Sequence, residues 1–565
     1  MKFRHILIPL LCAFSSGAHA AATPIEHLIV VVGENRTFDN LFATYRPKGG
    51  QFISNLLSKG IVNADGSPGP HYLLAAQHEA EDRDKYATEP AITGAYATLP
   101  QPYTTGAFGQ ALYSPDARFP GNLPNGPFQI TQYVYYGAHT GDPAHRFFQM
   151  WQQFDGGRMD LFTWVGETIG FGSANGPNSG RPGMTAQGGV SMGFYNMAAG
   201  DAPIMRKLAD RYAIGDNYHQ PIMGGTGPNY FALATGDVAY YSHDGKPAVP
   251  PENQTENPDP APGTNNWYRN DGYAGGSYVN CSDETQPGVH AIRNHLKRLP
   301  YKTFNDGNCA PGTYYLVNNY EPGFSATGTP APLGADRFTL PPETIPTIGE
   351  GLSARGVGWK WYAGGRGDGK TTVNKEYCTI CDPFTYSSKV MTSKLRENMQ
   401  DLSQFYRDVA GNLPAVSFIS PYDSISGHPG YAMEPGFDQF VEDIVDRVRK
   451  NGKLWKNTAI LITFDEGGGY YDSGYVQTLD FFGDGTRIPI IAISPWAKKG
   501  YVDHTYYDHV SILKFIEKNW GLTPLSKRSR DNLPNPLQSG KDPYVPLNRP
   551  AIGDLMNLFD FGKGP

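Results

Sequence analysis

Short apolar runs of strand length alternate along the chain with segments in which apolar side chains recur every three or four residues. This alternation is typical of a parallel or mixed β-sheet covered by helices. Six runs have the length and composition of buried strands: residues 27–32, 213–216, 359–362, 415–419, 459–464 and 488–493. The pattern therefore predicts an α/β fold built around one sheet.

The clearest helical pattern begins at Phe437 and leads into the apolar run at 459–464, so that the two form one α/β unit. Charged residues take the opposite face of this helix. A second helix is predicted after Asp508 and a third from Tyr230. The expected buried positions are Phe437, Phe440, Val441, Ile444, Val445 and Val448 in the first helix and Ile512, Leu513, Phe515 and Ile516 in the second.

Between about residues 240 and 340 the composition changes to Pro, Gly, Asn and Tyr, as in PPENQTENPDPAPGTNNWYRNDGYAGG. A loop-rich insertion is favoured over disorder, because Trp267, Tyr268, Tyr273 and Tyr278 supply apolar surface that can pack. The sequence shows no internal repeat and no heptad pattern. We therefore expect one domain over residues 21–565 that contains this insertion.

The first 20 residues have the order of a secretory signal peptide. Lys2 and Arg4 come first, an apolar run follows over residues 6–14, and small residues precede the expected cleavage point. No later stretch approaches the roughly 18–20 apolar residues that a membrane-spanning helix needs. We expect residues 1–20 to be removed on export, which leaves a periplasmic or extracellular chain without an integral membrane segment.

Export changes the interpretation of the cysteines, because the mature chain keeps four of the five. In an oxidising compartment we expect two disulfides, Cys281 with Cys309 and Cys378 with Cys381. The alternative is a zinc site, since the two cysteines at 378 and 381 have the spacing of zinc ligands. This alternative is less favoured, because the sequence has no second pair of cysteines at that spacing.

The sequence carries 47 basic and 54 acidic residues, a net charge of -7, and no run rich in Lys or Arg. Neither a nucleic-acid surface nor a polybasic membrane anchor is indicated. A charged ligand must therefore be bound by a local group of side chains.

Polar residues directly follow two of the predicted strands, at the point where α/β proteins bind ligands. Glu34 and Asn35 follow the first strand, and Asp465 and Glu466 follow the strand at 459–464. A single carboxylate at such a point is more often a helix N-cap. Three carboxylates and an amide without a compensating Lys would repel one another, and a hard divalent cation is the usual solution. The sequence therefore predicts a metal site.

Thr226 follows two glycines and stands shortly before the helical segment from Tyr230. A hydroxyl at the start of a helix lies where backbone N–H groups and the helix dipole favour a phosphate group. The alternative role for Thr226 is a helix N-cap. The neighbouring metal site favours a reactive hydroxyl, because a bound cation can lower its pKa.

Seven segments resemble, in order and approximate spacing, the bacterial phosphoesterase family that contains secreted acid phosphatases and nonspecific phospholipases C. They are IEHLIVVVGENRTFDNLF, GDPAHRFFQMWQQFDGGRMDLF, DNYHQPIMGGTGPNY, SGHPGYA, TAILITFDEGGGYYDSG, TRIPIIAISPWAKKG and YDHVSILKFIE. The resemblance covers nearly the whole mature chain. It implies a three-layer α/β/α sandwich, similar to that of the alkaline phosphatase superfamily, with one active site at the carboxyl edge of the sheet.

The resemblance implies a role for each matching residue. Glu34, Asn35, Asp465 and Glu466 resemble the metal-binding positions of the family, and Thr226 occupies the position of the nucleophile, next to the metal. The oxygen and amide ligands favour calcium, magnesium or manganese as the single divalent ion, whereas a histidine ligand would allow zinc or iron.

Histidines of the matching motifs would complete the site. His145 and His428 match histidines that contact the phosphoryl group, as hydrogen-bond donors or as the acid for the leaving oxygen. Asn229 lies near the nucleophile in its motif. His219 matches a less certain position. His504 and His509 are less secure, and His509 could either reach the site or cap the last helix.

The chain also departs from the family pattern. Many relatives read DEHGG followed by DH, whereas Gly467 follows Asp465-Glu466 here and Ser473 follows Asp472. Ser426-Gly427 likewise precedes His428, where many relatives carry Asn-Glu. Two imidazoles of the family pattern are therefore absent, so that the leaving-group acid or part of the phosphate site must come from elsewhere or be missing.

These observations predict an exported, metal-dependent phosphoester hydrolase that forms a phosphothreonine on Thr226. Acid phosphatase is the first hypothesis, because HPGYA and GDPAHRFFQMWQQFDGGRMD resemble that branch. Phospholipase C, acting on phosphodiesters, is the second, because the threonine nucleophile and YDHVS resemble the other branch. The third is a non-catalytic exported binding protein that uses the Tyr-rich insertion. The expected partner is a small phosphoester or a phospholipid, and not a nucleic acid.

Overall fold

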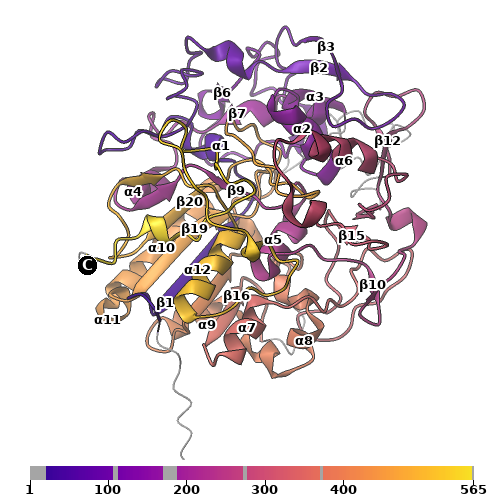
Figure 1. Ribbon diagram of the computed structural model, residues 1–565. Helices are drawn as coiled ribbons and strands as arrows, with labels where there is room; N and C mark the ends of the chain where they lie inside the picture. Colours follow the sequence, from indigo (N-terminus) through magenta and orange to yellow (C-terminus); the bar gives the residue numbers. More distant parts are fainter. Residues whose placement is uncertain (1–20, 106–111, 169–186, 271–275, 369–372, 563–565) are drawn as a thin grey trace, which may run out of the picture.

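An eight-stranded sheet forms the centre of the structure, a computed structural model that describes residues 21–105, 112–168, 187–270, 276–368 and 373–562 (Figure 1). The expected signal peptide, residues 1–20, lies outside the described residues, as does Tyr273. In the order of the sheet the strands are β17 (Met399–Asp401), β16 (Trp359–Ala363), β18 (Val416–Ser420), β1 (His27–Gly33), β19 (Thr458–Phe464), β20 (Ile490–Ile493), β8 (Ala213–Gly215) and β21 (Tyr501–Asp503).

All six strands that the apolar runs predict are present, with ends that differ by at most two residues. The edge strands β17 and β21 were not predicted, because each has only three residues. All strands of this sheet run in one direction except β20, which pairs antiparallel with both of its neighbours. The carboxyl ends of the other seven strands therefore lie at the same edge.

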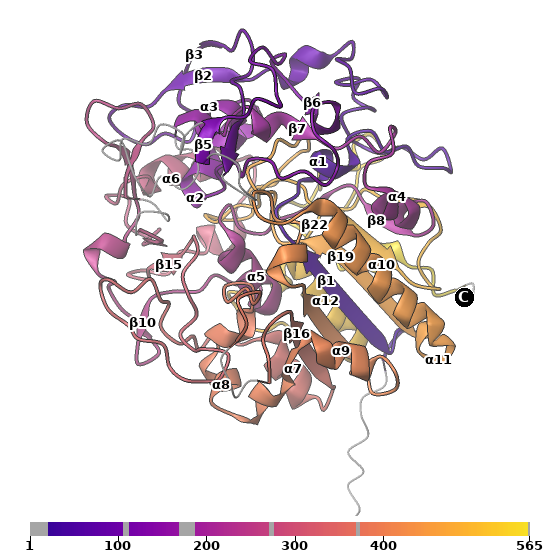
Figure 2. The ribbon, with the colours of Figure 1, turned by 180° about the vertical axis from the view of Figure 1, so that it is seen from behind.

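Helices cover both faces of the sheet, which confirms the predicted α/β/α sandwich. Ile29 and Val31 of β1 face one layer, and Leu28, Val30 and Val32 face the other, as the period of two in a strand requires. The first layer contains α4 (Pro203–Ala209), α9 (Leu402–Asp408) and α10 (Glu434–Lys450), seen in Figure 2. The second contains α5 (Thr226–Thr235), α7 (Ile348–Ala354) and α12 (Val510–Trp520), seen in Figure 1.

The two helices with the strongest predicted patterns are confirmed. In α10 every predicted apolar position is buried, and Arg447, Arg449 and Lys450 lie in the last turn, where cations stabilise the helix dipole. α12 begins two residues after Asp508 and buries its four predicted positions. No helix in the described ranges combines the length and the apolar composition that crossing a bilayer requires.

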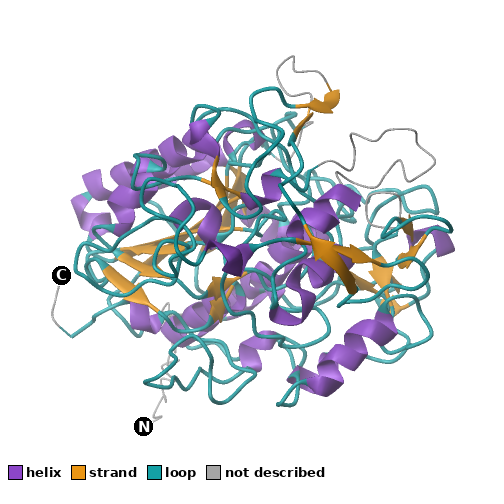
Figure 3. Cartoon of the chain, turned by 90° about the horizontal axis from the view of Figure 1, so that it is seen from above, coloured by secondary structure: helices purple, strands orange, loops and turns teal. Residues whose placement is uncertain are grey.

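Loops and short elements lie over the carboxyl edge of the sheet, in the upper part of Figure 1, and Figure 3 shows them from above. The helices here are α1 (Phe38–Phe42), α2 (Phe147–Phe154) and α3 (Phe162–Thr168). The paired strands are β2 (His78–Glu81) with β3 (Ala91–Ala95), β4 (Tyr103–Thr105) with β5 (Leu112–Pro115), β6 (Phe128–Gln129) with β7 (Gly193–Phe194), and β9 (Tyr218–His219) with β22 (Tyr507–Asp508).

The described residues between 240 and 340 form short pairs of strands, loops and the α-helix α6 (Val289–Arg298). The strands are β10 (Ser242–His243) with β11 (Lys246–Pro247), β12 (Asn257–Pro260) with β13 (Tyr268–Asn270), and β14 (Tyr278–Val279) with β15 (Tyr315–Leu316). The short helices α8 (Ser388–Met391) and α11 (Gly452–Trp455) are outside this insertion. The assignment of residues 21–565 to one domain stays a prediction.

Both expected disulfides are present. Cys281 is bonded to Cys309 within the insertion, and Cys378 is bonded to Cys381 in the loop after β16. The zinc alternative for the second pair is therefore wrong for the oxidised chain.

Candidate active site

Two pairs of polar residues meet where the neighbouring strands β1 and β19 end. In their parallel register the last residues of the two strands lie opposite each other. The backbone N–H of Asn35 donates to Oδ1 of Asp465 over 3.1 Å. Glu34, Asn35, Asp465 and Glu466 are each at most 2% exposed. The structure thus brings together the four residues that the sequence analysis assigned to a metal site.

Several oxygens of this group are buried and accept no hydrogen bond within the described part of the chain: Asn35 Oδ1, Asp465 Oδ2 and both carboxylate oxygens of Glu466. A buried polar atom left unpaired costs about 1–3 kcal/mol, and more when it is charged. Burial and the charge of Asp465 raise the pKa values of Glu34 and Glu466 well above their usual range. Burial also raises the pKa of Asp465 to about 7. A hard divalent cation would pair these oxygens, so the donor set fits one such ion.

Thr226 is the first residue of α5 and lines a cavity beside this group. The helix N-cap is Gly225, which has no side chain to form a capping hydrogen bond, so the alternative role of Thr226 as the N-cap is wrong. Thr226 is 3% exposed. Its hydroxyl is close enough to Asp465 for a hydrogen bond to lower the pKa of that carboxyl group. The hydroxyl thus lies between the N-terminus of a helix and a buried carboxylate, an arrangement that suits the activation of a hydroxyl group.

Two asparagines hold the segment that carries Thr226. Oδ1 of Asn229 accepts the N–H of Ile222 over 3.0 Å, and its Nδ2 donates to two carbonyl oxygens of the same loop. Asn229 is fully buried, and the described residues that line the cavity do not include it. Asn319 does line the cavity, and its Oδ1 accepts the N–H of Gly227 over 2.8 Å. Sequence reasoning missed Asn319, because it lies in the insertion, far along the chain.

His145 and His428 both line the cavity, with their ring centroids 6.2 Å apart. Nδ1 of each ring is 2.6 Å from a backbone carbonyl oxygen, of Pro143 and Pro429 respectively, and donates to it. Nε2 of His428 accepts from Nδ2 of Asn35 over 3.0 Å. Burial lowers the pKa of His145 well below its usual value and that of His428 to about 4. With Nδ1 donating to Pro429 and Nε2 accepting from Asn35, the neutral ring of His428 has no N–H left for a phosphoryl oxygen.

Three further residues of the cavity wall were not predicted: Asp142, Arg146 and Tyr431. Asp142 and Arg146 stand in the same motif as His145. The sequence signal that could have identified them is that a charged residue lies on either side of this histidine. The positive charge of Arg146 lowers the pKa of Glu466 and of Asp142, although burial outweighs it in both. The Tyr431 ring stacks on His428 at 4.2 Å, and its hydroxyl donates to Oε2 of Glu34 over 3.3 Å.

The remaining histidines of the sequence analysis do not line the cavity. His509 lies behind the metal group, where Nε2 donates to the backbone oxygen of Asp465 over 2.8 Å. His219 contacts Gly485, and His504 pairs with Asp216 at 2.7 Å. Of these three, only His509 contacts a residue of the candidate site, and it supports the backbone of Asp465.

The two positions at which the family pattern has a histidine and this chain does not are both packed against neighbouring residues. A Cβ atom on Gly467 would lie 2.3 Å from Oγ1 of Thr486 and 2.7 Å from Cγ2 of Thr37, so a histidine does not fit in this backbone arrangement. Ser473 donates to Oδ2 of Asp39 over 2.5 Å, in a buried network that includes Arg487. Both positions therefore support the loop after β19 and supply no group to the cavity.

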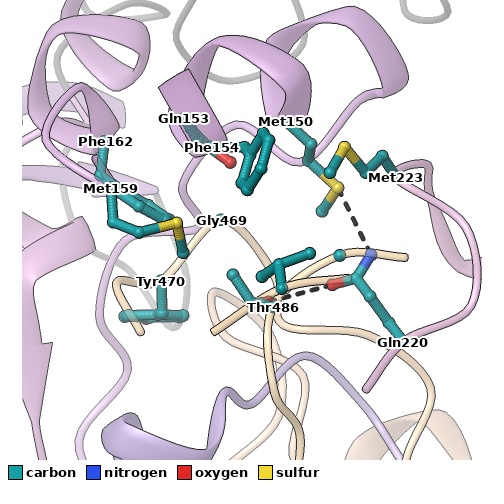
Figure 4. A pocket seen from close by; sticks show the side chains of 12 residues that line it. Met150, Gln153, Phe154, Met159, Phe162, Gln220, Met223, Gly469, Tyr470 and Thr486 are labelled. Carbon is teal, nitrogen blue, oxygen red and sulfur yellow. Dashed lines mark hydrogen bonds between the residues drawn. The ribbon is translucent and has the colours of Figure 1, made fainter. Parts of the chain in front are cut away.

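The cavity has a volume of about 360 Å³, enough for a phosphate group with a small organic substituent. Glu34, Asp142, His145, Arg146, Thr226 and Asn319 form its polar side, and Ile380, Pro429 and Tyr431 form an apolar side. A second pocket, shown in Figure 4, lies beside the loop after β19, and its lining includes three Met and two Phe side chains. Its volume of about 10 Å³ is near that of a single water site, which excludes a substrate.

Gln220 in this second pocket explains how the loop after β19 is held. Its Oε1 accepts the N–H of Gly467 over 2.9 Å and the hydroxyl of Thr486 over 3.2 Å. Its Nε2 faces the sulfur of Met150, as Figure 4 shows. The pocket is therefore part of the packing that holds the loop directly after Asp465 and Glu466.

Comparison with known proteins gives the family. The model of the phosphoesterase family matches residues 25–523, which covers all of the site residues described above. A non-hemolytic phospholipase C of Burkholderia pseudomallei is 28% identical over 45% of this chain, and the chain spans only 40% of that protein. Phospholipase C B of Mycobacterium tuberculosis (strain CDC 1551 / Oshkosh) is 21% identical over 96% of this chain and 79% of its own length. A probable acid phosphatase of Kluyveromyces lactis is 27% identical over 38% of this chain and 52% of its own length.

Among solved structures, a protein in the alkaline phosphatase superfamily from Vibrio parahaemolyticus aligns with a TM-score of 0.28 and 10% identity, over 58% of this chain and 63% of that protein. The family match rests on the sequence itself, and it covers well over half of the 565 residues. This chain therefore belongs to the phosphoesterase family.

Proposed function

We propose that this chain is a cation-dependent phosphoester hydrolase in which the hydroxyl of Thr226 attacks phosphorus. The observation that carries the proposal is the placement of that hydroxyl, at the start of α5 and within hydrogen-bonding reach of Asp465 at the end of β19. A simple binding site would not need a buried hydroxyl next to a group of buried carboxylates with unpaired oxygens.

Glu34, Asn35, Asp465, Glu466 and Thr226 would hold one divalent cation. When bound, it would lower the pKa of the threonine hydroxyl and offset the charge of the phosphoryl oxygens. The oxygen ligands favour calcium, magnesium or manganese over softer metals. Asn35 is oriented for this role, because Nδ2 donates to His428 and Oδ1 is thereby left for a cation.

The reaction would proceed in two displacements on phosphorus. Oγ1 of Thr226 forms a bond to phosphorus, the bond to the leaving oxygen breaks, and the hydroxyl proton moves toward the carboxylate of Asp465. Water then attacks the phosphothreonine, which releases phosphate, or a phosphate monoester from a diester, and regenerates the hydroxyl. Asn229 and Asn319 would act as positioning residues, because they hold the loop on which Thr226 stands.

Arg146 and His145 would serve the phosphoryl group and the leaving oxygen. Arg146 can donate two parallel hydrogen bonds to phosphoryl oxygens. Nδ1 of His145 is committed to Pro143, so its contact with a substrate would be made by Nε2. A bound phosphate dianion would favour a proton on that nitrogen, which the ring could pass to the leaving oxygen.

A phosphomonoester is the first substrate class in this proposal, because Arg146, the cation and the N-terminus of α5 together favour the two negative charges of a monoester. A phosphodiester of a lipid is the second. The apolar side of the cavity, with Ile380 and Tyr431, favours it, and two of the relatives compared above carry the name phospholipase C. An exported location is part of the proposal, supported by the expected signal at residues 1–20 and by the two disulfides.

The test is turnover by the purified mature chain of a panel that contains aryl and alkyl phosphomonoesters, nucleotides and phosphatidylcholine, with each candidate cation added in turn. We expect release of phosphate from monoesters, and loss of that release on chelation. Release of phosphocholine from phosphatidylcholine without monoester turnover would reverse the order of the two substrate classes. No turnover of any ester with any of the cations would contradict the proposal and favour a binding protein.

A further inference from the structure

The loop between β16 and β17 brings a disulfide to the metal-binding group. Cys378 is half-buried and lines the cavity, and Cys381 is fully buried beneath it. Sγ of Cys381 lies 3.0 Å from Oε1 of Glu34. A disulfide sulfur carries no hydrogen, so this contact does not satisfy the carboxylate. One wall of the cavity is therefore a disulfide that can be reached from the cavity and that touches a proposed ligand of the cation.

The two sulfur atoms and the carboxylate lie close enough together to become ligands of one metal ion once the disulfide opens. One ligand atom from each of Glu34, Cys378 and Cys381 lies within 4.8 Å of the other two. In a tetrahedral zinc site with zinc–sulfur bonds of about 2.3 Å, two thiolates stand about 3.8 Å apart. The spacing of two residues between the cysteines is also that of many zinc-binding pairs. Breaking the disulfide would therefore leave two thiols and a carboxylate at ligand distance.

The loop would keep this arrangement after the disulfide opens, because other bonds hold its two ends. The hydroxyl of Tyr377 donates to Oδ2 of Asp382 over 2.6 Å, and this bond joins the residues that flank the two cysteines. Arg366 pairs with the same carboxylate at 3.3 Å. Thr379, between the cysteines, donates to Glu321 over 2.6 Å. The cysteines are thus positioned by the loop and not only by their own bond.

We propose that Cys378, Cys381 and Glu34 form a redox-gated site for a thiophilic divalent metal, such as zinc or cadmium. A dithiol reductant transfers two electrons to the disulfide, the S–S bond breaks, two thiols form and the reductant becomes a disulfide. The metal ion then binds both sulfur atoms as two protons pass to solvent, and Glu34 provides the third ligand.

Binding at this site withdraws Glu34 from the hard cation, so the reduced, metal-loaded chain loses turnover. This consequence rests on the proposed function, whereas the binding itself does not. The second disulfide provides an internal comparison, because Cys281 and Cys309 do not line the cavity among the described residues and have no carboxylate grouped with them.

The experiment measures cadmium binding to the full mature chain, reduced with dithiothreitol and then desalted without oxygen. The readouts are thiolate-to-cadmium charge-transfer absorption and equilibrium dialysis, neither of which depends on turnover. We expect one cadmium ion per reduced chain, for the wild type and for the Cys281→Ala/Cys309→Ala variant. We expect no such absorption for the oxidised wild type or for the reduced Cys378→Ala/Cys381→Ala variant, and Glu34→Gln should weaken binding about tenfold.

Circular dichroism and thermal melting confirm that each form is folded, and the oxidised and reduced wild type provide the comparison if a variant does not fold. Three outcomes would each overturn the proposal: a Cys378–Cys381 disulfide that resists the dithiol in the folded chain, two free thiols without cadmium absorption, or equal absorption in the Cys378→Ala/Cys381→Ala variant. Absence of phosphoester turnover in all forms would affect the proposed function alone, since the binding measurement stands without it.

Discussion

Replacement of Thr226 by alanine tests whether its hydroxyl is a nucleophile or has only a structural role. The change removes Oγ1 and one buried methyl group from a side chain that is 3% exposed. No capping hydrogen bond is lost, because the N-cap is Gly225. Deletion of one buried methyl group costs about 1 kcal/mol of unfolding free energy. The turnover number should fall about 10³-fold or more, which corresponds to at least about 4 kcal/mol in the activation free energy.

Thr235 provides a matched control in the same helix. It is also fully buried, and its hydroxyl donates to the backbone oxygen of Phe231 over 2.8 Å. Thr235→Ala should lower the unfolding free energy by about 1–2 kcal/mol, since it removes a methyl group and a hydrogen bond. Its turnover number should stay within about twofold of the wild type, because the residue is about two and a half helical turns from the site.

The assays are steady-state turnover, denaturant unfolding and covalent trapping. Brief incubation with substrate followed by acid quench should leave phosphate on the peptide that contains Thr226. Thr226→Ser keeps the oxygen and should retain turnover within about tenfold of the wild type. A Thr226→Ala protein that works at the wild-type rate would refute the mechanism. Trapped phosphate on another residue would refute the assignment of the nucleophile.

Three further predictions concern the cation, the loop after β19 and pH. Asp465→Asn should weaken cation binding at least tenfold in titration calorimetry, since it removes one charge from the group; unchanged affinity would contradict the proposed ligand set. Gly467→Ala should cost about 1–3 kcal/mol of unfolding free energy, because its Cβ would lie 2.3 Å from Thr486, and an equally stable variant would contradict the packing argument. Burial alone would lower the pKa of His504, but the hydrogen bond and charge of Asp216 raise it above 6.5. The pairing of protonated His504 with Asp216 therefore stabilises the fold below the unfolded-state pKa, and this stabilisation is lost as pH rises through the folded-state pKa. We expect His504→Asn to lower the melting temperature more at about pH 5 than at about pH 9. An equal loss at both pH values would contradict the ion pair.

The elements predicted from the sequence are those whose burial is continuous along the chain. β1 and β19 are apolar on both faces and α10 has a full apolar stripe, so local pattern alone determines them. The polar residues directly after β1 and β19 were found for the same reason, since their position follows from the strands. The edge strands β17 and β21 were missed because three residues carry too little pattern.

The cavity residues that do not follow a strand could not be predicted from the local sequence pattern. Asn319 reaches the cavity from the insertion, and Tyr431 reaches it from a turn after His428. Neither stands at the end of a strand, and their positions depend on contacts between segments far apart in the sequence. The sequence motif placed Asn229 near the nucleophile. Only the structure shows that its side-chain amide is hydrogen-bonded to the backbone of its own loop.

The residues at the strand ends and the residues of the apolar cavity wall are therefore held by different parts of the fold. The metal-type ligands extend from β1 and β19, whose residues pair in continuous parallel register from His27 to Gly33 at the centre of the sheet, so a shift of these ligands would require the sheet to deform. The apolar wall stands on loops, where substitutions are tolerated. We expect substitutions of Ile380 or Tyr431 to change KM and the preferred ester more than the turnover number, and substitutions at the strand ends to do the reverse.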